Sequence, residues 1–330
     1  MTRRNFLLGA AALTALAALT ATRGASAQAA WPAAKAITLI VPFSAGGNVD
    51  TTARLVGGKL AERLRQTIVV DNIAGAGGLV GVARAVQAAP DGYTLVMAFD
   101  GPIAITSFVN PAAMRFDPQR DLAPVALTTT APMVLVARPT LEVTSMAQLV
   151  ALARSQPGKL SYATSGIGTV LHLAMEMIKQ RAGLFIVHIP YRGGAQIATD
   201  VIGNQVDLAL MVSTSATPHV LAGRMKALAV TGHQRLAQLP NVPTLDETPG
   251  FKGLVVNSWT GVFAPARTPV AIVERLNAEI NAVLQQGEVR GKLAEGGALV
   301  GSGSAASFAQ FTRDERTRFE AIVKAAQIKE

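Results

Sequence analysis

The chain has 330 residues, a formal net charge of +9 at pH 7 and no cysteine. The missing cysteines exclude a disulfide and a lipid-modified cysteine. Lysine and arginine are scattered singly and aromatic residues make up 5% of the chain, which argues against nucleic-acid binding.

The first 27 residues predict a signal peptide. Arg3 and Arg4 precede an apolar stretch at 6–21, and Ala25-Ser26-Ala27 fits a cleavage site. The arginine pair also resembles a twin-arginine export signal. We therefore expect the mature protein to begin near Gln28 in the periplasm, with a net charge of +9 − 3 = +6 because the leader carries three arginines and no acid. A positive field of this kind suits an anionic small ligand.

A strand followed by a glycine-rich loop and a helix opens the mature chain. Residues 37–41 are apolar and mostly β-branched, Gly46 and Gly47 follow, and a helical pattern begins at about residue 50. The first N–H groups of a helix lack internal partners and lie at the positive end of the helix dipole, so the loop at 42–50 can hold an anion. It lacks the Lys-Ser/Thr ending of a nucleotide-binding loop, which favours a carboxylate. An ordinary strand–helix turn is the alternative.

Further strands alternate with helices along the chain. This alternation predicts an α/β fold with doubly wound parallel sheets. The long stretches at 125–137 and 257–264 are expected to cross between two domains, and Ser307 is expected to cap the last helix. The other predicted strands are at 67–70, 94–98, 160–163, 185–190, 208–212 and 225–231.

Two more glycine-containing loops open helices in the second half of the chain. One lies at 164–169, before a helix that contains His172, and the other lies at 191–195. Ligands of such sheets bind beyond the carboxyl ends of the strands, where these loops are expected.

These loops, in this order, resemble the substrate-binding proteins of tripartite tricarboxylate transporters, the Bug receptor family. The resemblance covers about residues 32–328. It is carried by Val-Pro-Phe-Ser-Ala-Gly-Gly-Asn-Val-Asp at 41–50, Ala-Pro-Asp-Gly-Tyr-Thr-Leu at 89–95, Tyr-Ala-Thr-Ser-Gly-Ile-Gly-Thr at 162–169, Pro-Tyr-Arg-Gly-Gly-Ala at 190–195 and Ser-Trp-Thr-Gly-Val-Phe-Ala-Pro at 258–265.

The resemblance implies a type II periplasmic binding-protein fold, with two α/β domains that close on a ligand. The first domain is expected at 28–130 and 258–330, and the second at 131–257. It implies a monomeric receptor, without a cofactor or metal, that captures a small carboxylate (a di- or tricarboxylate, an aromatic carboxylate or an amino acid) and delivers it to integral-membrane transporter subunits.

The resemblance also implies the ligand-binding residues. In the first domain they lie in the loop at 42–50, and in the second they lie at 164–169 and at the helix start near 192–195. They are Phe43, Ser44, Ala45, Gly46, Gly47, Asp50, Thr164, Ser165, Gly168, Thr169, Arg192 and Gly193.

Asp50, Asp100 and His172 have distinct expected roles. Asp50 is assigned to shaping its loop or holding waters, because a carboxylate repels an anionic ligand. Asp100 follows the strand at 94–98, and either binds a donor group of the ligand or caps the helix expected after Gly101-Pro102. His172 is included as a residue lining the cleft.

Two other functions are weighed. A hydrolase would use Ser165 and His172, but Ala163 stands where a Gly-x-Ser-x-Gly motif needs glycine. The same receptor could instead feed a periplasmic signalling partner.

Overall fold

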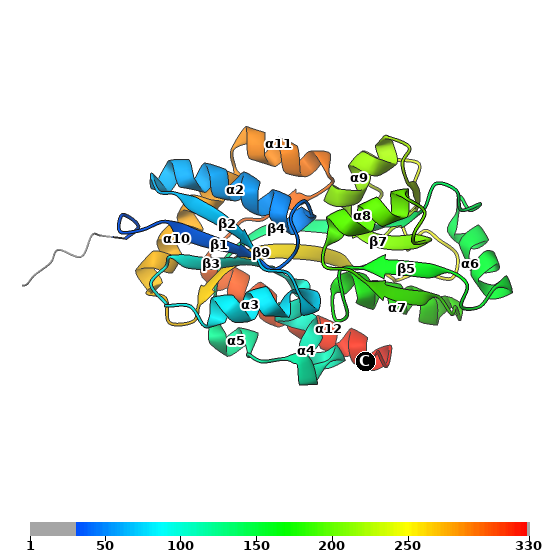
Figure 1. Ribbon diagram of the computed structural model, residues 1–330, viewed down its shortest axis with the longest axis horizontal. Helices are drawn as coiled ribbons and strands as arrows, with labels where there is room; N and C mark the ends of the chain where they lie inside the picture. The colour runs from blue at the N-terminus through cyan, green and yellow to red at the C-terminus, as the bar shows by residue number, and fades with distance from the viewer. Residues whose placement is uncertain (1–30, 329–330) are drawn as a thin grey trace, which may run out of the picture.

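A computed structural model describes residues 31–328, and the expected signal peptide at 1–27 lies outside this range. The chain forms an elongated molecule with two lobes, left and right in Figure 1, and long strands between them. No helix within residues 31–328 is long and apolar enough to cross a membrane.

The sheet has the strand order β2-β1-β3-β9-β4-β7-β5-β6, and β8 and β10 also pair with β4. The strands are β1 (Ile37–Val41), β2 (Ile68–Asn72), β3 (Thr94–Phe99), β4 (Leu122–Ala137), β5 (Ser161–Thr164), β6 (Val187–Pro190), β7 (Leu208–Val212), β8 (Lys226–Val230), β9 (Asn257–Pro265) and β10 (Leu299–Val300).

The sheet is mixed, whereas the sequence predicted parallel sheets. Strand β1 is parallel to β2 and β3, and β5 is parallel to β6 and β7, as the alternation of strands and helices requires. Strand β9 is antiparallel to β3 and to β4, and β4 is antiparallel to β7. The reason is that β4 carries the chain out to the second lobe and β9 carries it back.

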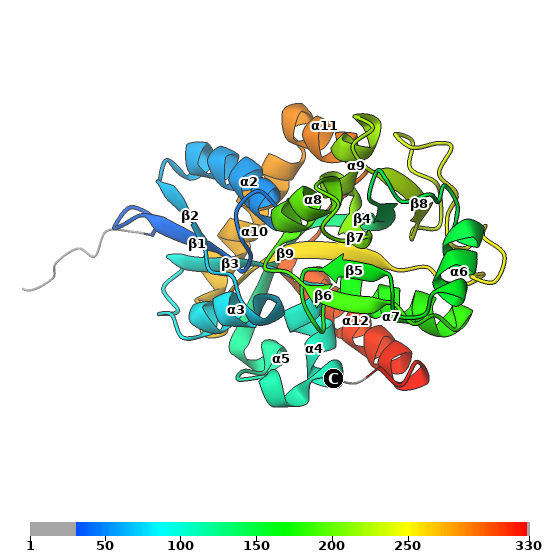
Figure 2. The same cartoon turned by 45° about the vertical axis from the view of Figure 1, so that its right-hand side comes forward.

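Strands β4 and β9 are the two crossing strands that the sequence predicted. They pair from Leu122 with Pro265 to Pro132 with Asn257. Figures 1 and 2 show β4 and β9 running side by side from one lobe to the other. We use the predicted boundaries at 130/131 and 257/258 to label the first and second lobes; the boundaries themselves stay a prediction.

Helices cover both faces of the sheet in each lobe (Figure 2). In the second lobe α7 lies on the face opposite α8 and α9. The helices are α2 (Asn48–Leu64), α3 (Leu79–Val86), α4 (Thr106–Val109), α5 (Pro118–Asp121), α6 (Met146–Ser155), α7 (Val170–Ala182), α8 (Gly194–Ile202), α9 (Ser213–Leu221), α10 (Val270–Leu284), α11 (Gly287–Glu295) and α12 (Ala305–Ala325).

Helix α12 packs its aromatic side chains against the crossing strands. The Phe308 ring lies 5.0 Å from that of Phe263 and 6.0 Å from that of Trp259, and all three residues are buried. The expected cap at Ser307 is wrong: Ser304 is the N-cap, and its side chain accepts a hydrogen bond from the Ser307 N–H. The Ser304-Ala305-Ala306-Ser307 sequence allows either serine to begin the helix.

Replacing Phe308 by alanine is expected to lower the free energy of unfolding by about 3–5 kcal/mol, because it leaves a cavity between α12 and β9. Denaturant unfolding measures the change. Leu299→Ala is the control: Leu299 is 72% exposed, and the change should stay within about 0.5 kcal/mol. Equal effects in the two variants would contradict this account of the core.

Candidate functional site

Three helices begin at the cleft between the lobes without a side-chain cap. Helix α2 starts after Gly47, α8 after Gly193 and α9 after Val212, and no side chain of these N-cap residues accepts a hydrogen bond from the helix. Each start therefore presents backbone N–H groups and the positive end of a helix dipole.

The starts of α2, α8 and α9 lie close together. A Cβ atom placed on Gly47 would lie 3.3 Å from the amide nitrogen of Gly194, and one placed on Gly194 would lie 3.7 Å from the Ser215 Oγ. Three positive helix ends so close together repel one another unless negative charge lies among them. This arrangement favours an anionic group among the three helix starts.

Asp50 holds the loop at 42–50 in shape. Its Oδ2 accepts hydrogen bonds from the Gly46 N–H (2.9 Å) and the Arg54 Nε (3.1 Å), and its Oδ1 accepts one from the Asn72 Nδ2 (2.9 Å). Gly46 has a φ of +85°, which glycine adopts without strain. Asp50 is buried under the loop, in keeping with the loop-shaping role assigned to it.

Burial would raise the pKa of the Asp50 carboxyl. The hydrogen bonds from Arg54, Gly46 and Asn72, with the charge of Arg54, outweigh burial and hold this pKa below its usual value. The carboxylate therefore stays ionised and keeps its backbone partners in place.

Ser44 and the start of α8 meet across the cleft. The Ser44 N–H donates to the Arg192 carbonyl (3.2 Å), and a Cβ on Gly193 would collide with the Ser44 Oγ. The buried Ser44 Oγ has no hydrogen-bond partner within the described residues. The Arg192 side chain is exposed, so its backbone rather than its guanidinium forms this part of the cleft. Ala45 and Gly46 are exposed at the rim.

The loop at 164–169 holds itself together and leaves Ser165 at the cleft. The Thr169 Oγ1 donates to the Gly166 carbonyl (2.7 Å) and accepts from the His172 N–H (3.3 Å), so Thr169 caps α7. The Thr164 Oγ1 accepts from the Gly166 N–H (3.2 Å). The Gly168 carbonyl accepts a hydrogen bond of 3.2 Å from Thr106 of the first lobe.

Asp100 caps a helix, but that helix is α7 of the other lobe. Its Oδ1 accepts from the Val170 N–H (3.3 Å), and its Oδ2 accepts from the Ser258 Oγ (2.7 Å) and the Trp259 N–H (3.2 Å). It makes no capping bond to the π-helical turn Gly101–Ile105 that follows it. One alternative from the sequence was that Asp100 caps the helix after Gly101-Pro102. Asp100 does cap a helix, but that helix is α7.

Burial raises the pKa of Asp100 from 3.8 to about 7, against the opposing effect of its three hydrogen bonds; the charge of Glu315 adds to the rise. No cation offsets the burial, in contrast to Arg54 at Asp50.

The cavity between the lobes has a volume of about 30 Å³, which is room for water and not for an organic ligand. The structure is thus a closed state. Most of the residues that line this cavity are apolar, and none of them is charged. The lining residues are Phe43, Gly47, Asn48, Val49, Phe99, Ser165, Val170, Leu171, Gly194, Ile197, Met211, Val212, Ser215 and Ser258.

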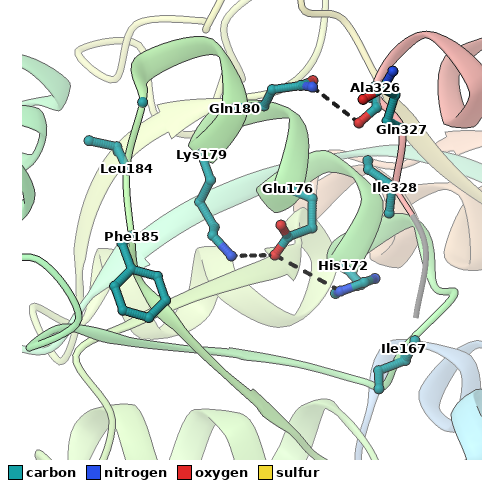
Figure 3. A pocket seen from close by; sticks show the side chains of 11 residues that line it. Ile167, His172, Glu176, Lys179, Gln180, Leu184, Phe185, Ala326, Gln327 and Ile328 are labelled. Carbon is teal, nitrogen blue, oxygen red and sulfur yellow. Dashed lines mark hydrogen bonds and ion pairs between the residues drawn. The ribbon is translucent and has the colours of Figure 1, made fainter.

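His172 does not line this cavity, which corrects its placement in the predicted cleft. It faces a second cavity of about 720 Å³ on the other side of α7, together with Glu176 and Lys179 (Figure 3). The Lys179 Nζ donates to the Glu176 Oε1 (2.6 Å), and the His172 Nε2 lies 4.0 Å from that oxygen. Side chains at i and i+4 share a helix face, so His172 turns with Glu176 away from the cleft. Ser165 and His172 line different cavities, and no hydrogen bond joins them.

Sequence analysis missed the contribution of α9. The helix follows β7 directly, and Val212 and Ser215 line the cavity. Ser213-Thr214-Ser215 after a buried strand was the available signal, since hydroxyl residues favour helix starts. The helix contains Pro218, which hides it from a pattern-based prediction.

The fold is that of an α/β binding protein with two lobes, and uncapped helix starts meet at the cavity between them. The model of the tripartite tricarboxylate transporter family receptor matches residues 52–328, so the chain belongs to that family. A protein encoded in the tcbD-tcbE intergenic region of Pseudomonas sp. (strain P51) is 38% identical over 321 residues, 97% of this chain and 94% of that protein. Protein BugT of Bordetella pertussis is 33% identical over 292 residues, 88% of this chain and 89% of BugT.

Solved structures agree with this assignment. A protein of R. palustris solved with adipate has a TM-score of 0.86 and 34% identity, covering 90% of this chain and 98% of its own. MatC from Rhodopseudomonas palustris, with bound malate, has a TM-score of 0.85 and 32% identity, covering 88% and 99%. The periplasmic binding protein BugD has a TM-score of 0.85 and 30% identity, covering 90% and 99%.

These comparisons confirm the resemblance to the Bug receptors and the two-lobed α/β fold of periplasmic binding proteins. The family consists of solute-binding receptors.

Asp100 should make the stability of the protein fall as the pH rises from about 4 to about 7. Over this range the folded protein keeps a proton on Asp100 that the unfolded chain has lost, so rising pH favours unfolding. Asp100→Asn removes this contribution. Urea unfolding of both proteins at about pH 5 and about pH 8 should show the variant gaining at least about 1 kcal/mol relative to the wild type at the higher pH. A constant difference between them would contradict the raised pKa.

Proposed function

We propose that this protein is an extracytoplasmic receptor that closes on a small carboxylate-bearing ligand and delivers it to a membrane transporter of the tripartite tricarboxylate type. The observation that carries the proposal is the meeting of the uncapped starts of α2, α8 and α9 at Gly47, Gly194 and Ser215. A carboxylate there supplies the acceptors and the negative charge that these helix ends lack.

Ligand entry requires the lobes to separate, because the closed cavity is far smaller than an organic ligand. Closure brings the Ser44 N–H to the Arg192 carbonyl, Thr106 to the Gly168 carbonyl and Asp100 to the Val170 N–H. These polar contacts between the lobes are those expected of a receptor whose closed form is selected by its ligand. The adipate and malate bound in the R. palustris structures support a carboxylate as that ligand.

Within the site, four of the predicted residues have a proposed role in binding. Gly47 and Ser44 face the ligand carboxylate from the first lobe, and Gly193 lets α8 approach it from the second. Ser165 contributes a hydroxyl to the lining. Delivery to integral-membrane subunits is carried over from the family as part of this proposal.

Gly47→Ala should weaken carboxylate binding at least tenfold, because the added Cβ lies 3.3 Å from the Gly194 nitrogen and obstructs closure. Calorimetry and thermal shift against a panel of small carboxylates measure this. Wild-type protein at 100 times Kd should gain about 2.7 kcal/mol of stability. The ligand should be recovered unchanged.

Gly58→Ala is the matched control on the same helix. A Cβ at Gly58 has nothing within 4 Å, so affinity should not change, and the protein should be stabilised by about 0.5–1 kcal/mol. Full affinity in Gly47→Ala, or no carboxylate bound by the wild type, would overturn the proposed site.

The periplasmic location of this chain also belongs to the proposal, since relatives such as BugD are periplasmic. Residues 1–27 should be removed on export, so that N-terminal sequencing of periplasmic protein begins near Gln28. Arg3→Lys combined with Arg4→Lys should block export by the twin-arginine route. Normal export of that double variant would exclude this route and leave the destination standing.

A further inference from the structure

The start of α7 already holds a carboxylate that belongs to the chain itself. Asp100 is wholly buried and accepts the Val170 N–H, while Ser258 and Trp259 of β9 donate to its other oxygen. Val170 and Ser258 both line the cavity between the lobes, so Asp100 lies directly behind that wall.

The other helix starts at this cavity have no such partner. Helices α2, α8 and α9 lack side-chain caps and meet at Gly47, Gly194 and Ser215. The cavity therefore has two unlike ends. One offers the uncapped N–H groups of three helix starts, where the first-turn carboxylate of α2, Asp50, is already paired with Arg54, and the other has its helix start capped by Asp100.

We propose that Asp100 sets the class of ligand: a molecule with one carboxylate, bound at the starts of α2, α8 and α9, and a neutral apolar body that points toward α7. The inference rests on the proposed function and narrows it from carboxylates in general to monocarboxylates.

The cavity wall between the two ends suits an apolar body. The rings of Phe43 and Phe99 lie 4.7 Å apart, and Leu171, Ile197 and Met211 complete the surface. No lysine, arginine or histidine side chain lines the cavity to balance a second ligand carboxylate. Such a carboxylate near α7 would be buried beside a like charge, which is strongly unfavourable.

The charge on Asp100 makes this selectivity depend on pH. Burial brings the pKa of Asp100 to about 7, the Ser258 hydroxyl lowers it and the charge of Glu315 raises it. Glu315 of α12 is paired with Arg318 (2.7 Å) and accepts the Trp259 indole N–H (3.1 Å). On α7, the titratable His172, Glu176 and Lys179 face the second cavity instead.

The experiment compares ligands that differ only in the second carboxylate. Hexanoate is matched with adipate and butyrate with succinate, and each is titrated calorimetrically into the mature protein at about pH 6 and about pH 8. At the higher pH the wild type should bind each monocarboxylate at least tenfold more tightly than its partner, and the ratio should shrink at the lower pH. In Asp100→Asn the ratio should fall at about pH 8 and lose the pH dependence that Asp100 gives it, although the apolar lining still disfavours a second carboxylate; this variant also corrects for ionisation of the ligands.

Two further variants test the same charge without removing Asp100. Ser258→Ala takes away a hydrogen bond that lowers the pKa of Asp100, so the pH midpoint of the selectivity should rise. Glu315→Gln removes a charge that raises this pKa, so the midpoint should fall. Opposite shifts support the proposal even if Asp100→Asn fails to fold, and unmoved midpoints refute it.

The outcomes separate this inference from the proposed function. Tighter binding of adipate than of hexanoate by the wild type, or an unchanged ratio in a folded Asp100→Asn, overturns the role of Asp100 and leaves a carboxylate receptor. Binding of neither mono- nor dicarboxylates overturns both.

Discussion

Helix ends of the same sign face each other where Gly47 meets Gly194, and the architecture around the cleft follows from that constraint. Two such ends can approach closely only if no side chain separates them, and negative charge between them reduces their repulsion. Gly47 at the start of α2 and Gly194 at the start of α8 meet this condition, because neither has a side chain. None of the N-cap residues of α2, α8 and α9 supplies a capping side chain, and Asp50 in the first turn of α2 is paired with Arg54; in the proposed function a ligand carboxylate supplies the negative charge.

Two buried carboxylates near the cleft show how surroundings decide the role of a residue type. Asp50 has Arg54 beside it, keeps a low pKa and fixes the Gly46 turn. Asp100 has only neutral donors, and burial lifts its pKa to about 7. Both bind backbone N–H groups rather than facing the cavity. Asp50 therefore shapes the loop at 42–50, and Asp100 occupies the start of α7.

The sequence was most informative where function depends on local order along the chain. Strand, glycine-rich loop and helix start are consecutive, so the loops at 42–50, 164–169 and 191–195, each of which opens a helix, could be located from pattern alone. Contacts between distant segments could not. Ser258 is 158 residues from Asp100, and nothing local announces that β9 returns antiparallel between β3 and β4 to bring the two together. The predicted place of His172 in the cleft was wrong for a related reason. A helix that starts at the cleft can turn any of its faces toward it, and the sequence does not show which one.

Ser258 links the cavity to the crossing strands. It lines the cavity, donates to Asp100 and lies on β9, opposite Ala131 of β4, where the chain passes from one lobe to the other. Asp100 in turn reaches α7 of the second lobe, so one carboxylate joins a first-lobe loop, a crossing strand and a second-lobe helix. Separation of the lobes must break the bond to Val170, whereas the bonds to Ser258 and Trp259 lie within the first lobe. The proposed opening therefore costs the hydrogen bond that Asp100 accepts at the start of α7, which favours the closed form.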